Sequence, residues 1–564
     1  MINDSDRIHE IAAREAGAEE TREFRIFGPP GCGKTTSLSR QIARAAAKFG
    51  ADAVLVTSFS RAAAAELAGR DLPIAGDRIG TLHSHCYRAL GGPEIAEANV
   101  EEWNRDNKHM AITPVKKQHK LDGEESGEDD DSGLAKDGDS FLQQVGRLRG
   151  MQLPERAWPP NLREFGHQWT EYKQANGLMD FTDLIATCLR DVAVAPRNPS
   201  VIFADEAQDL NRMQLTLIRK WGERAQYFIV AGDDDQTIFS FAGAQPEAML
   251  HPDIPADHKI ILKQSYRVPR AVHALAERTI HQVTIRQEKV YLPRPEDGHL
   301  SKLAAGGYNS TEYGILKTAE EHVARGQTVM FLASCSYMVK PLIQVLRKHG
   351  IPFHNPYRRT NGFWNPIRLT KPGASANRVL ALLVAHRDFG EDHRPWTQGD
   401  VALWADWLAS KGLLRHGAKK LLQQADTDRE ATLDYLDRIF ETGALDSLMG
   451  AWEGDYRGLL QWWRDRLTVD AAKRSEFPAE IAVRQGPQAL LDTPKITVGT
   501  IHSVKGGQAD VVYLFPDLSR AGDEQYQRMG AARDSVVRLF YVGITRARHT
   551  LYICQRESHR AISI

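Results

Sequence analysis

A glycine-rich loop between an apolar strand and an amphipathic helix constrains this chain more than any other feature of its sequence. The loop, Gly28-Pro-Pro-Gly-Cys-Gly-Lys34-Thr35, fits the pattern G-x-x-x-x-G-K-[ST]. The run Phe24–Phe27 precedes it, and apolar residues at helical spacing follow it as far as Gly50. The backbone N–H groups of such a loop and the N-terminus of the helix bind phosphate. The sequence therefore predicts an α/β fold with a nucleotide-phosphate site.

The residue types of this loop assign roles to its side chains. Lys34 is expected to reach the β- and γ-phosphates of the nucleotide, and the Thr35 hydroxyl is expected to bind Mg²⁺. The residues expected to bind the nucleotide are Gly28, Pro29, Pro30, Gly31, Cys32, Gly33, Lys34, Thr35 and Thr36. A glycine turn without a ligand is the alternative, and the flanking strand and helix argue against it.

An apolar strand later in the chain ends in two carboxylates. The segment is Val201-Ile-Phe-Ala-Asp205-Glu206. A carboxylate held out of water needs a partner, and Mg²⁺ supplies one for Asp205. Glu206 can then orient or deprotonate an attacking water. The sequence thus predicts Thr35 and Asp205 as metal ligands and Glu206 as a catalytic group.

Composition excludes several classes of protein. The chain has 564 residues, of which 42% are hydrophobic and 26% charged, so a disordered or fibrous protein is excluded. The longest apolar run, Val379–Ala385, is far shorter than the about 20 residues that cross a bilayer. No secretory signal is visible, and the five scattered cysteines are expected to be reduced thiols. We therefore expect a cytoplasmic protein without a membrane partner.

The charge of the chain is unevenly distributed. Its formal net charge is −1, but residues 122–131 hold only acidic charges, which leaves the remainder basic. We expect 122–131 to be a solvated, mobile loop, with mimicry of a nucleic-acid strand as the alternative. Any site for a polyanion must be a local cationic surface.

Strand-like runs alternate with helical patterns in the first half of the chain, which favours a doubly wound, mostly parallel sheet. Expected strands are Phe24–Phe27, Val54–Val56, Val201–Ala204, Phe228–Ala231 and Ile260–Leu262. A second set is Val329–Leu332, Ile496–Val498, Val511–Leu514 and Leu551–Ile553. Residues 89–177 and 373–491 interrupt the alternation and are helical in pattern. The second of these segments holds six tryptophans, which are expected to pack a helical core, with stacking on nucleic acid as the alternative.

Two sequence blocks around the carboxylates carry a resemblance to a known family. The blocks ADEAQD (204–209) and AGDDDQTIFSF (231–241) resemble those of superfamily 1A helicases of the UvrD, PcrA and Rep type. Further blocks occur in the order of that family: TSFSRAAAAEL (57–67), GTLHS (80–84), DFTDL (180–184), LKQSYR (262–267), IPFHNPYRRTNGFW (351–364), TVGTIHSVKGG (497–507) and RLFYVGITRAR (538–548).

The resemblance implies two RecA-like P-loop NTPase domains, each with a parallel doubly wound sheet, and two mostly helical inserted subdomains. Domain 1A would comprise residues 1–88 and 178–265, with subdomain 1B at 89–177. Domain 2A would comprise residues 266–372 and 492–564, with subdomain 2B at 373–491.

The resemblance also implies the activity and the partners. The expected activity is ATP-dependent movement along single-stranded DNA with 3′→5′ polarity and unwinding of duplex DNA. The expected cofactors are ATP and Mg²⁺, and the expected partners are single-stranded DNA and duplex/single-strand junctions. Repair, replication restart and phage replication stay open as pathways.

The resemblance assigns site residues as well. The catalytic set is Lys34, Asp205, Glu206, Gln236, Arg267 and Arg546. Gln236 would sense the γ-phosphate, the two arginines would reach it, and Tyr266 would stack on the adenine. The expected DNA-binding residues are Phe59, Thr81, His83, Phe241, Thr500, His502 and Lys505. For Phe59 and Phe241, a place in the core is the alternative.

Three positions depart from the family pattern. Residues 1–27 contain no glutamine to read adenine, so hydrolysis of other nucleoside triphosphates is a hypothesis. Ala242 stands where the family has an arginine, and Gln508 stands where an acidic residue is usual. We expect these departures to alter the coupling between hydrolysis and movement but not to inactivate the site, because the catalytic set is complete.

Two alternatives to an unwinding enzyme stay open. One is a translocase that strips proteins from single strands with little unwinding. The other is an ATP-gated DNA-binding protein that acts as an assembly factor. A small-molecule kinase with a phosphate loop does not explain the second strand set or the block at 538–548.

Overall fold

The computed structural model of the chain describes residues 22–115, 137–310, 314–358, 362–367, 369–370 and 373–564. They form two compact units. Unit 1 comprises Met1–Leu300, Leu518–Leu551 and Arg560–Ile564, and unit 2 comprises Ser301–Asp517 and Tyr552–His559. The acidic stretch at 122–131 lies outside the described residues. The division into domains 1A, 1B, 2A and 2B stays a prediction.

Unit 1 is built on a six-stranded sheet with the strand order β3-β2-β4-β5-β1-β6. The strands are β1 (Glu23–Phe27), β2 (Val54–Ser58), β3 (Ile79–Thr81), β4 (Val201–Asp205), β5 (Tyr227–Gly232) and β6 (Lys259–Ile261). All neighbouring pairs are parallel. The strands predicted from the sequence and the α/β class are confirmed.

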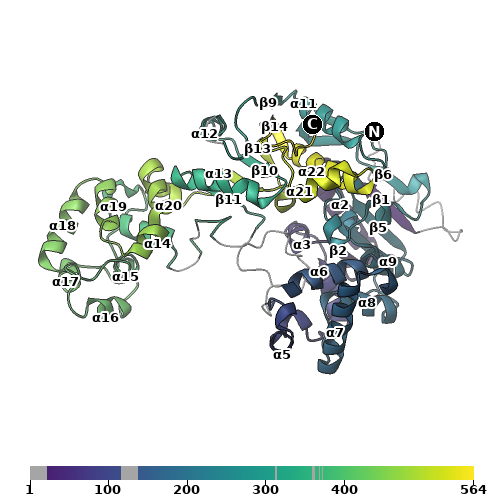
Figure 1. Cartoon of the computed structure of the whole chain (residues 1–564), viewed down its shortest axis with the longest axis horizontal. Helices are drawn as coiled ribbons and strands as arrows, with labels where there is room; N and C mark the ends of the chain where they lie inside the picture. Colours follow the sequence, from purple (N-terminus) through teal and green to yellow (C-terminus); the bar gives the residue numbers. More distant parts are fainter. Residues whose placement is uncertain (1–21, 116–136, 311–313, 359–361, 368, 371–372) are drawn as a thin grey trace. The chain divides into compact units, whose positions relative to one another are not determined.

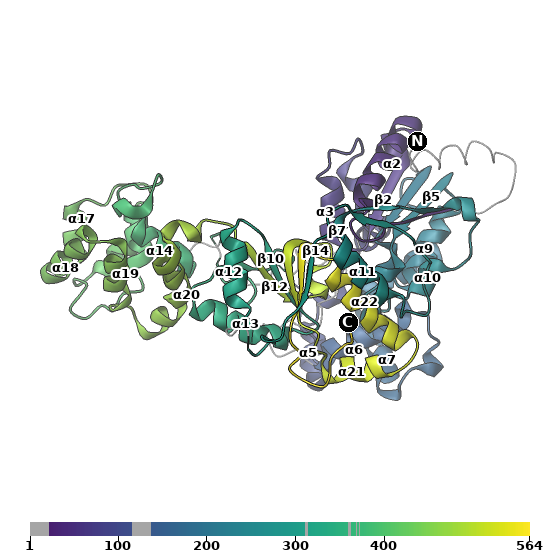
Figure 2. The same cartoon turned by 90° about the horizontal axis from the view of Figure 1, so that it is seen from above.

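Helices cover both faces of this sheet. They are α2 (Lys34–Phe49), α3 (Arg61–Ala68), α4 (Leu82–Ala89), α8 (Phe181–Asp191) and α9 (Arg212–Gly222). Alternate residues of a strand point to opposite faces, so Ile26 packs with α2 and α3 whereas Phe27 packs with α4, α8 and α9. Figure 2 shows α2 and α3 on one side of the strands and α9 on the other. The sheet is therefore doubly wound.

The remaining elements of unit 1 include a small parallel sheet of β7 (Gln264–Pro269) and β8 (Leu292–Arg294). Its other helices are α10 (Pro246–Leu250), α11 (Arg270–Ile280), α21 (Arg520–Gln527) and α22 (Ala531–Ile544). Helix α22 packs against α11 and against the short 3₁₀ helix η7 (Asp234–Gln236). These contacts bring the block at 538–548 next to the end of β5.

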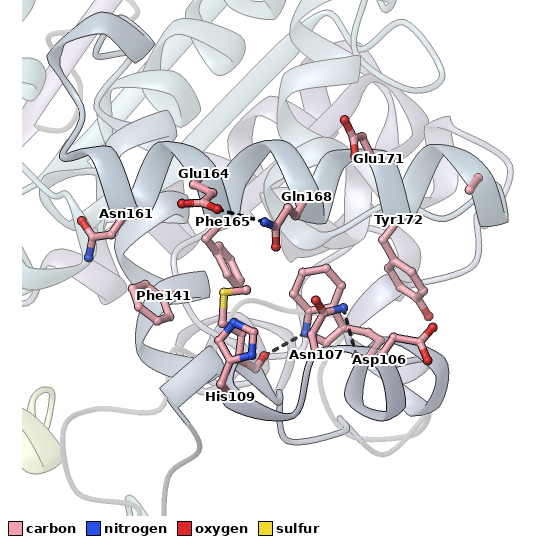
Figure 3. Close-up of a pocket in the computed structure, with 13 residues that line it drawn as sticks. Asp106, Asn107, His109, Phe141, Asn161, Glu164, Phe165, Gln168, Glu171 and Tyr172 are labelled. Carbon is pink, nitrogen blue, oxygen red and sulfur yellow. Dashed lines mark hydrogen bonds between the residues drawn. The ribbon is translucent and has the colours of Figure 1, made fainter.

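The insertion at 89–177 contains α5 (Glu101–Asp106), α6 (Asp137–Gly150) and α7 (Pro160–Asn176). A pocket of about 800 Å³ lies between α7, the segment at 106–110 and Phe141 (Figure 3). Asp106, Glu164 and Glu171 line it, and among the residues that the structure describes no lysine or arginine does. The charged side chains of this described lining are thus acidic.

Unit 2 holds most of a second six-stranded sheet with the strand order β11-β12-β10-β13-β14-β9. The strands are β9 (His299–Lys302), β10 (Val329–Ala333), β11 (Phe353–His354), β12 (Ile496–Thr500), β13 (Ala509–Leu514) and β14 (Ala547–Ile553). The pairs among β10, β11, β12 and β13 are parallel. Helices α12 (Leu316–Ala324) and α13 (Ser336–Lys348) pack against the sheet. The second predicted strand set is confirmed.

A helical segment interrupts unit 2 between β11 and β12 (Figure 1). Its helices are α14 (Ser375–Leu383), α15 (Gln398–Ala405), α16 (Ala418–Gln423), α17 (Leu433–Asp437), α18 (Thr442–Glu453), α19 (Tyr456–Arg464) and α20 (Val469–Gln485). Five of its six tryptophans are buried and Trp452 is half-buried. The indole of Trp463, for example, donates to the carbonyl of Trp404 at 2.9 Å. The prediction of a tryptophan-packed core is confirmed. Within the ranges described above, no helix combines the length and apolar character of a bilayer-spanning segment.

A buried ionic network joins the insertion at 89–177 to α8. Lys173 Nζ lies 2.5 Å from Asp180 Oδ2 and 2.5 Å from Asp183 Oδ2. Glu97 accepts from the backbone N–H of Phe181 at 3.1 Å through Oε1, and its buried Oε2 has no hydrogen-bond partner. Burial and the nearby Asp180 charge raise the pKa of Glu97 to about 8. Glu97 is therefore protonated at neutral pH in the folded protein.

We predict that Glu97 makes the stability of the chain fall as the pH rises. The pKa of Glu97 in the folded protein, about 8, lies above the about 4.3 of an unfolded glutamate. The contribution of Glu97 to the free energy of unfolding is therefore complete below pH 4 and is lost as the pH rises to 8. Glu97→Gln should flatten the melting temperature between pH 5 and 9 in thermal unfolding. The exposed Glu171→Gln is the control and should keep the wild-type slope. Identical slopes in wild type and Glu97→Gln would contradict the assignment.

Candidate active site

The glycine-rich loop runs from the end of β1 to the start of α2 and is held by its backbone. The N–H of Gly28 donates to the carbonyl of Gly232 at 2.9 Å, which ties the loop to the end of β5. Gly31 and Gly33 have φ values of +74° and +73°, a region that favours glycine. The first turn of α2 carries no acidic residue, so its free N–H groups remain available to an anion. The geometry is that of a phosphate-binding loop.

Lys34 lies between the two predicted carboxylates. Its Nζ is 2.6 Å from Asp205 Oδ1 and 2.5 Å from Glu206 Oε1. The three residues meet because β1 and β4 are strands of one parallel sheet, whose carboxyl ends share an edge. Burial disfavours the charged ammonium, but the two carboxylates outweigh it and raise the pKa of Lys34. Burial raises the pKa of Asp205, against the effect of Lys34.

Glu206 follows β4 in a left-handed backbone conformation, with φ 51°. A glutamate rarely adopts this conformation, and such strain concentrates at functional sites. The turn continues into η6 (Ala207–Asp209). It aims the Glu206 side chain at Lys34, whereas a regular strand would alternate Asp205 and Glu206 between opposite faces.

Gln208 is a site residue that the sequence interpretation missed. Its Nε2 donates to Glu206 Oε2 at 2.5 Å, and its Oε1 accepts from the backbone N–H of Asp233 at 3.0 Å. The side chain is 1% exposed, so both ends of the amide are used inside the protein. Gln208 thus connects the carboxylate of Glu206 to the end of β5. Its position inside the block ADEAQD was the sequence signal that could have identified it as a site residue.

Gln236 and Arg546, predicted to act at the γ-phosphate, are in contact. Arg546 Nη2 donates to Gln236 Oε1 at 3.1 Å, and Gln236 Nε2 donates to Asp233 Oδ2 at 2.8 Å. Arg546 is 1% exposed and its Nε donates to the carbonyl of Val542. Both residues belong to unit 1. A chain of hydrogen bonds therefore leads from Lys34 through Glu206, Gln208, Asp233 and Gln236 to Arg546.

Strand β7 places Arg267 and Tyr266 against the glycine-rich loop. The N–H of Tyr266 donates to the carbonyl of Gly31 at 2.9 Å, and the Ser265 hydroxyl donates to the carbonyl of Pro30 at 2.7 Å. A Cβ on Gly31 would lie 2.4 Å from Arg267 Cβ. Tyr266 is 71% exposed, so its ring is accessible beside the loop. The predicted site residues in the loop after β1, on α2, at the end of β4 and on β7 are thus brought together.

Three partly exposed aromatic rings lie together: Phe59, which follows β2, and Phe239 and Phe241, which follow η7. The rings of Phe59 and Phe239 have centroids 5.2 Å apart, and those of Phe239 and Phe241 are 5.8 Å apart. All three side chains are half-buried, and Phe59 also packs against the core. Phe239 was missed, although it lies two residues before Phe241 in the same block. His83 packs edge-on against Phe181 at 6.2 Å.

The predicted DNA-binding threonines cap turns of the same design in the two units. Thr81 Oγ1 accepts from the N–H of Ser84 at 3.2 Å, and Thr500 Oγ1 accepts from the N–H of Ser503 at 3.2 Å. In each turn the serine hydroxyl donates back to the threonine carbonyl, at 2.8 and 2.9 Å. Thr81 and Thr500 are buried, whereas His83, His502 and Lys505 are half-buried. Contact of these residues with DNA stays a prediction.

The two departures inside the described residues differ in exposure. Ala242 is buried in η8 (Ser240–Ala242), and Gln508 is exposed after η13 (His502–Val504). Burial of Ala242 leaves no room for an arginine in the same backbone conformation without rearrangement.

We predict that Gly31→Ala lowers stability more than Gly33→Ala in the absence of nucleotide. Both substitutions force alanine into a left-handed conformation at about 1–2 kcal/mol. The new Cβ at 31 also meets Arg267 Cβ at 2.4 Å, whereas the Cβ at 33 has no atom within 4 Å. The added overlap should cost a further about 1–3 kcal/mol in denaturant unfolding. Equal losses would show that the loop and β7 are not packed as described.

Comparisons with known proteins agree with this geometry. Residues 10–254 match the model of the UvrD/REP helicase N-terminal domain, and residues 495–554 match that of the UvrD-like helicase C-terminal domain. Together the two matches cover more than half of the chain.

Three curated relatives illustrate the similarity. The chain is 23% identical to the ATP-dependent DNA helicase UvrD1 of Mycobacterium leprae, over 96% of this chain and 81% of that protein. It is 25% identical to the ATP-dependent DNA helicase PcrA of Staphylococcus epidermidis, over 94% of this chain and 80% of that protein. It is 27% identical to the ATP-dependent DNA helicase Rep of Buchnera aphidicola, over 33% of this chain and 31% of that protein. The chain therefore belongs to the UvrD/Rep family of ATP-hydrolysing helicases.

Proposed function

We propose that this chain is an ATP-dependent DNA helicase that moves 3′→5′ along single-stranded DNA and unwinds duplex DNA at a junction. The observation that carries the proposal is the placement of Lys34, Asp205 and Glu206 at one edge of the sheet, beside a phosphate-binding loop. The polarity rests on the family resemblance, and the names of the relatives support DNA as the substrate.

The proposed chemistry is transfer of the γ-phosphoryl group of ATP to water. Catalysis of this reaction consists of positioning and of stabilising negative charge. We assign Lys34 to the phosphates, Glu206 to the attacking water, and Arg267 and Arg546 to the charge that develops on the γ-phosphate. Because the phosphates would compete for Lys34, nucleotide binding would release Glu206 from its present partner.

The donor set also fits Mg²⁺. Magnesium prefers oxygen ligands and in phosphoryl transfer usually takes one or two protein ligands besides phosphate and water. Thr35 and Asp205 offer a hydroxyl and a carboxylate, and Lys34 Nζ lies 2.6 Å from Asp205 Oδ1. Bound there, Mg²⁺ would neutralise phosphate charge.

The proposed DNA contacts are of two kinds. Phe59, Phe239 and Phe241 offer ring faces, and stacking of a base on an aromatic ring gives about 1–3 kcal/mol for any sequence. Thr500, His502 and Lys505 are assigned to the DNA backbone. We expect binding to weaken steeply with salt, because phosphate contacts release counterions.

We predict that Glu206→Gln lowers DNA-stimulated ATP hydrolysis by about 10²–10⁴-fold, since it removes the base that acts on water. Arg546→Ala should lower it by about 10³-fold, since it removes a cation from the γ-phosphate. Lys34→Ala should abolish turnover and weaken nucleotide binding, whereas Glu206→Gln should bind nucleotide normally. Steady-state ATPase and fluorescent-nucleotide titration measure the two effects, with the exposed Glu171→Gln as the control. Retained turnover in Lys34→Ala or Glu206→Gln would refute the site assignment.

We further predict unwinding of duplexes with a 3′ single-stranded tail and not of those with a 5′ tail. Strand displacement with both substrates measures this directly, with Glu206→Gln as the inactive control. Displacement of a protein block from single strands without unwinding would favour the translocase alternative. DNA binding with ATP turnover but no movement would favour an assembly factor.

A further inference from the structure

Three consecutive aspartates are buried together after β5. Asp233 is 1% exposed, and Asp234 and Asp235 are 0% exposed. Three neighbouring carboxylates out of water cannot all stay ionised without cations at contact distance. The segment between α11 and β8, which the family resemblance left without an assigned role, supplies those cations.

Lys289 contacts all three carboxylates. Its Nζ lies 3.2 Å from Asp233 Oδ1, 2.5 Å from Asp234 Oδ1 and 2.9 Å from Asp235 Oδ2, and the residue is 3% exposed. Arg286 makes a bidentate pair with Asp235, with Nη2 2.7 Å from Oδ2. Lys289 is therefore the cation that faces Asp233.

Asp233 in turn orients the amide of Gln236. Asp233 Oδ2 accepts from Gln236 Nε2 at 2.8 Å, and Gln236 Oε1 accepts from Arg546 Nη2 at 3.1 Å. An ionised carboxylate only accepts and a guanidinium only donates, so one orientation of the amide satisfies both partners. A protonated Asp233 could instead donate its O–H to the amide oxygen of Gln236. The amide NH₂ would then face the guanidinium of Arg546, which only donates, and the Gln236–Arg546 hydrogen bond would be lost.

We propose that Lys289 is a positioning residue for ATP hydrolysis: it keeps Asp233 ionised, and Asp233 fixes the Gln236 amide so that its oxygen holds Arg546. The proposal rests on the roles assigned above to Gln236 and Arg546. It gives Lys289 an effect on catalysis although its contacts are all with other protein groups. The expected signature is a change in turnover that depends on pH.

The electrostatics of the cluster support this role. Burial raises the pKa of Asp233, and the charge of Lys289 acts in the opposite direction. Burial likewise raises the pKa of Asp234 to about 6, even with Lys289 in place. Among the described residues, the titratable and charged groups with an electrostatic effect to or from Asp233 include Cys32, Asp234, Asp235, Lys289, Tyr291 and Tyr541.

Three of the groups named above are neutral, and Lys289 is the cation among them that balances the negative charge of Asp233. Burial raises the pKa of the Cys32 thiol and of the Tyr291 and Tyr541 hydroxyls, so these groups carry no charge at neutral pH. Removal of the Lys289 charge would therefore leave Asp233 beside two further carboxylates. The pKa of Asp233 would rise, and the fraction of molecules with an ionised Asp233 would fall at pH 7.

The test compares DNA-stimulated ATPase from pH 6 to 9 in wild type, Lys289→Met and Lys289→Arg. We expect kcat of Lys289→Met to fall at least tenfold at pH 7 and to recover toward wild type at pH 9, with KM for ATP changed less than threefold. Lys289→Arg keeps the charge and should keep the wild-type pH profile. Arg286→Met is the matched control, because it removes a cation that pairs with Asp235, and its activity relative to wild type should not depend on pH.

A second pair of variants separates charge from packing. Asn at position 233 keeps an acceptor oxygen for Gln236 but does not bind a proton. Asp233→Asn/Lys289→Met should therefore lose the pH dependence of Lys289→Met and regain part of its kcat at pH 7. If Lys289→Met fails to fold, this double variant decides the question, with circular dichroism as the check of folding.

Three results would bear against the proposals in distinguishable ways. A loss in Lys289→Met that is the same at every pH would show a structural role only and overturn the positioning role. A folded double variant as inactive as Lys289→Met would overturn it as well. Absence of DNA-stimulated hydrolysis in wild type would instead refute the proposed function on which it rests.

Discussion

The candidate site of unit 1 depends on one interaction, in which the ammonium group of Lys34 lies between two carboxylates. Lys34 comes from the loop after β1, and Asp205 and Glu206 come from the end of β4. They meet because every strand pair in the sheet is parallel, which brings the carboxyl ends to one edge. Each further residue of the site is fixed relative to this contact, either through the loop backbone or through Gln208.

The same contact balances the charges of these three side chains. A buried carboxylate pair without a cation would be strongly destabilising, and a lone buried lysine would be as well. In the proposed mechanism Lys34 exchanges a carboxylate partner for a phosphate when the nucleotide binds.

The sequence predicted the strands and the loop because their signals are local. Apolar runs mark β1 and β4, and the glycine spacing marks the phosphate site. The burial of the tryptophans followed from their helical surroundings in the same way. The burial and the role of Lys289 could not be predicted from the adjacent sequence, because the polar stretch Arg286-Gln-Glu-Lys289 is typical of a solvent-exposed segment. Its partner Asp234 lies 55 positions earlier in the chain, and only the packing of unit 1 brings the two side chains together.

The turns capped by Thr81 and Thr500 have nearly the same sequence in the two units. Gly80-Thr-Leu-His-Ser and Gly499-Thr-Ile-His-Ser differ at one position, and a Cβ on either glycine would lie 2.4 or 2.6 Å from the serine hydroxyl. One strand in each unit therefore ends in the same threonine-capped turn, and in both turns the first position leaves no space for a side chain. In the proposed function, each unit would contact the DNA strand through the same kind of threonine-capped turn.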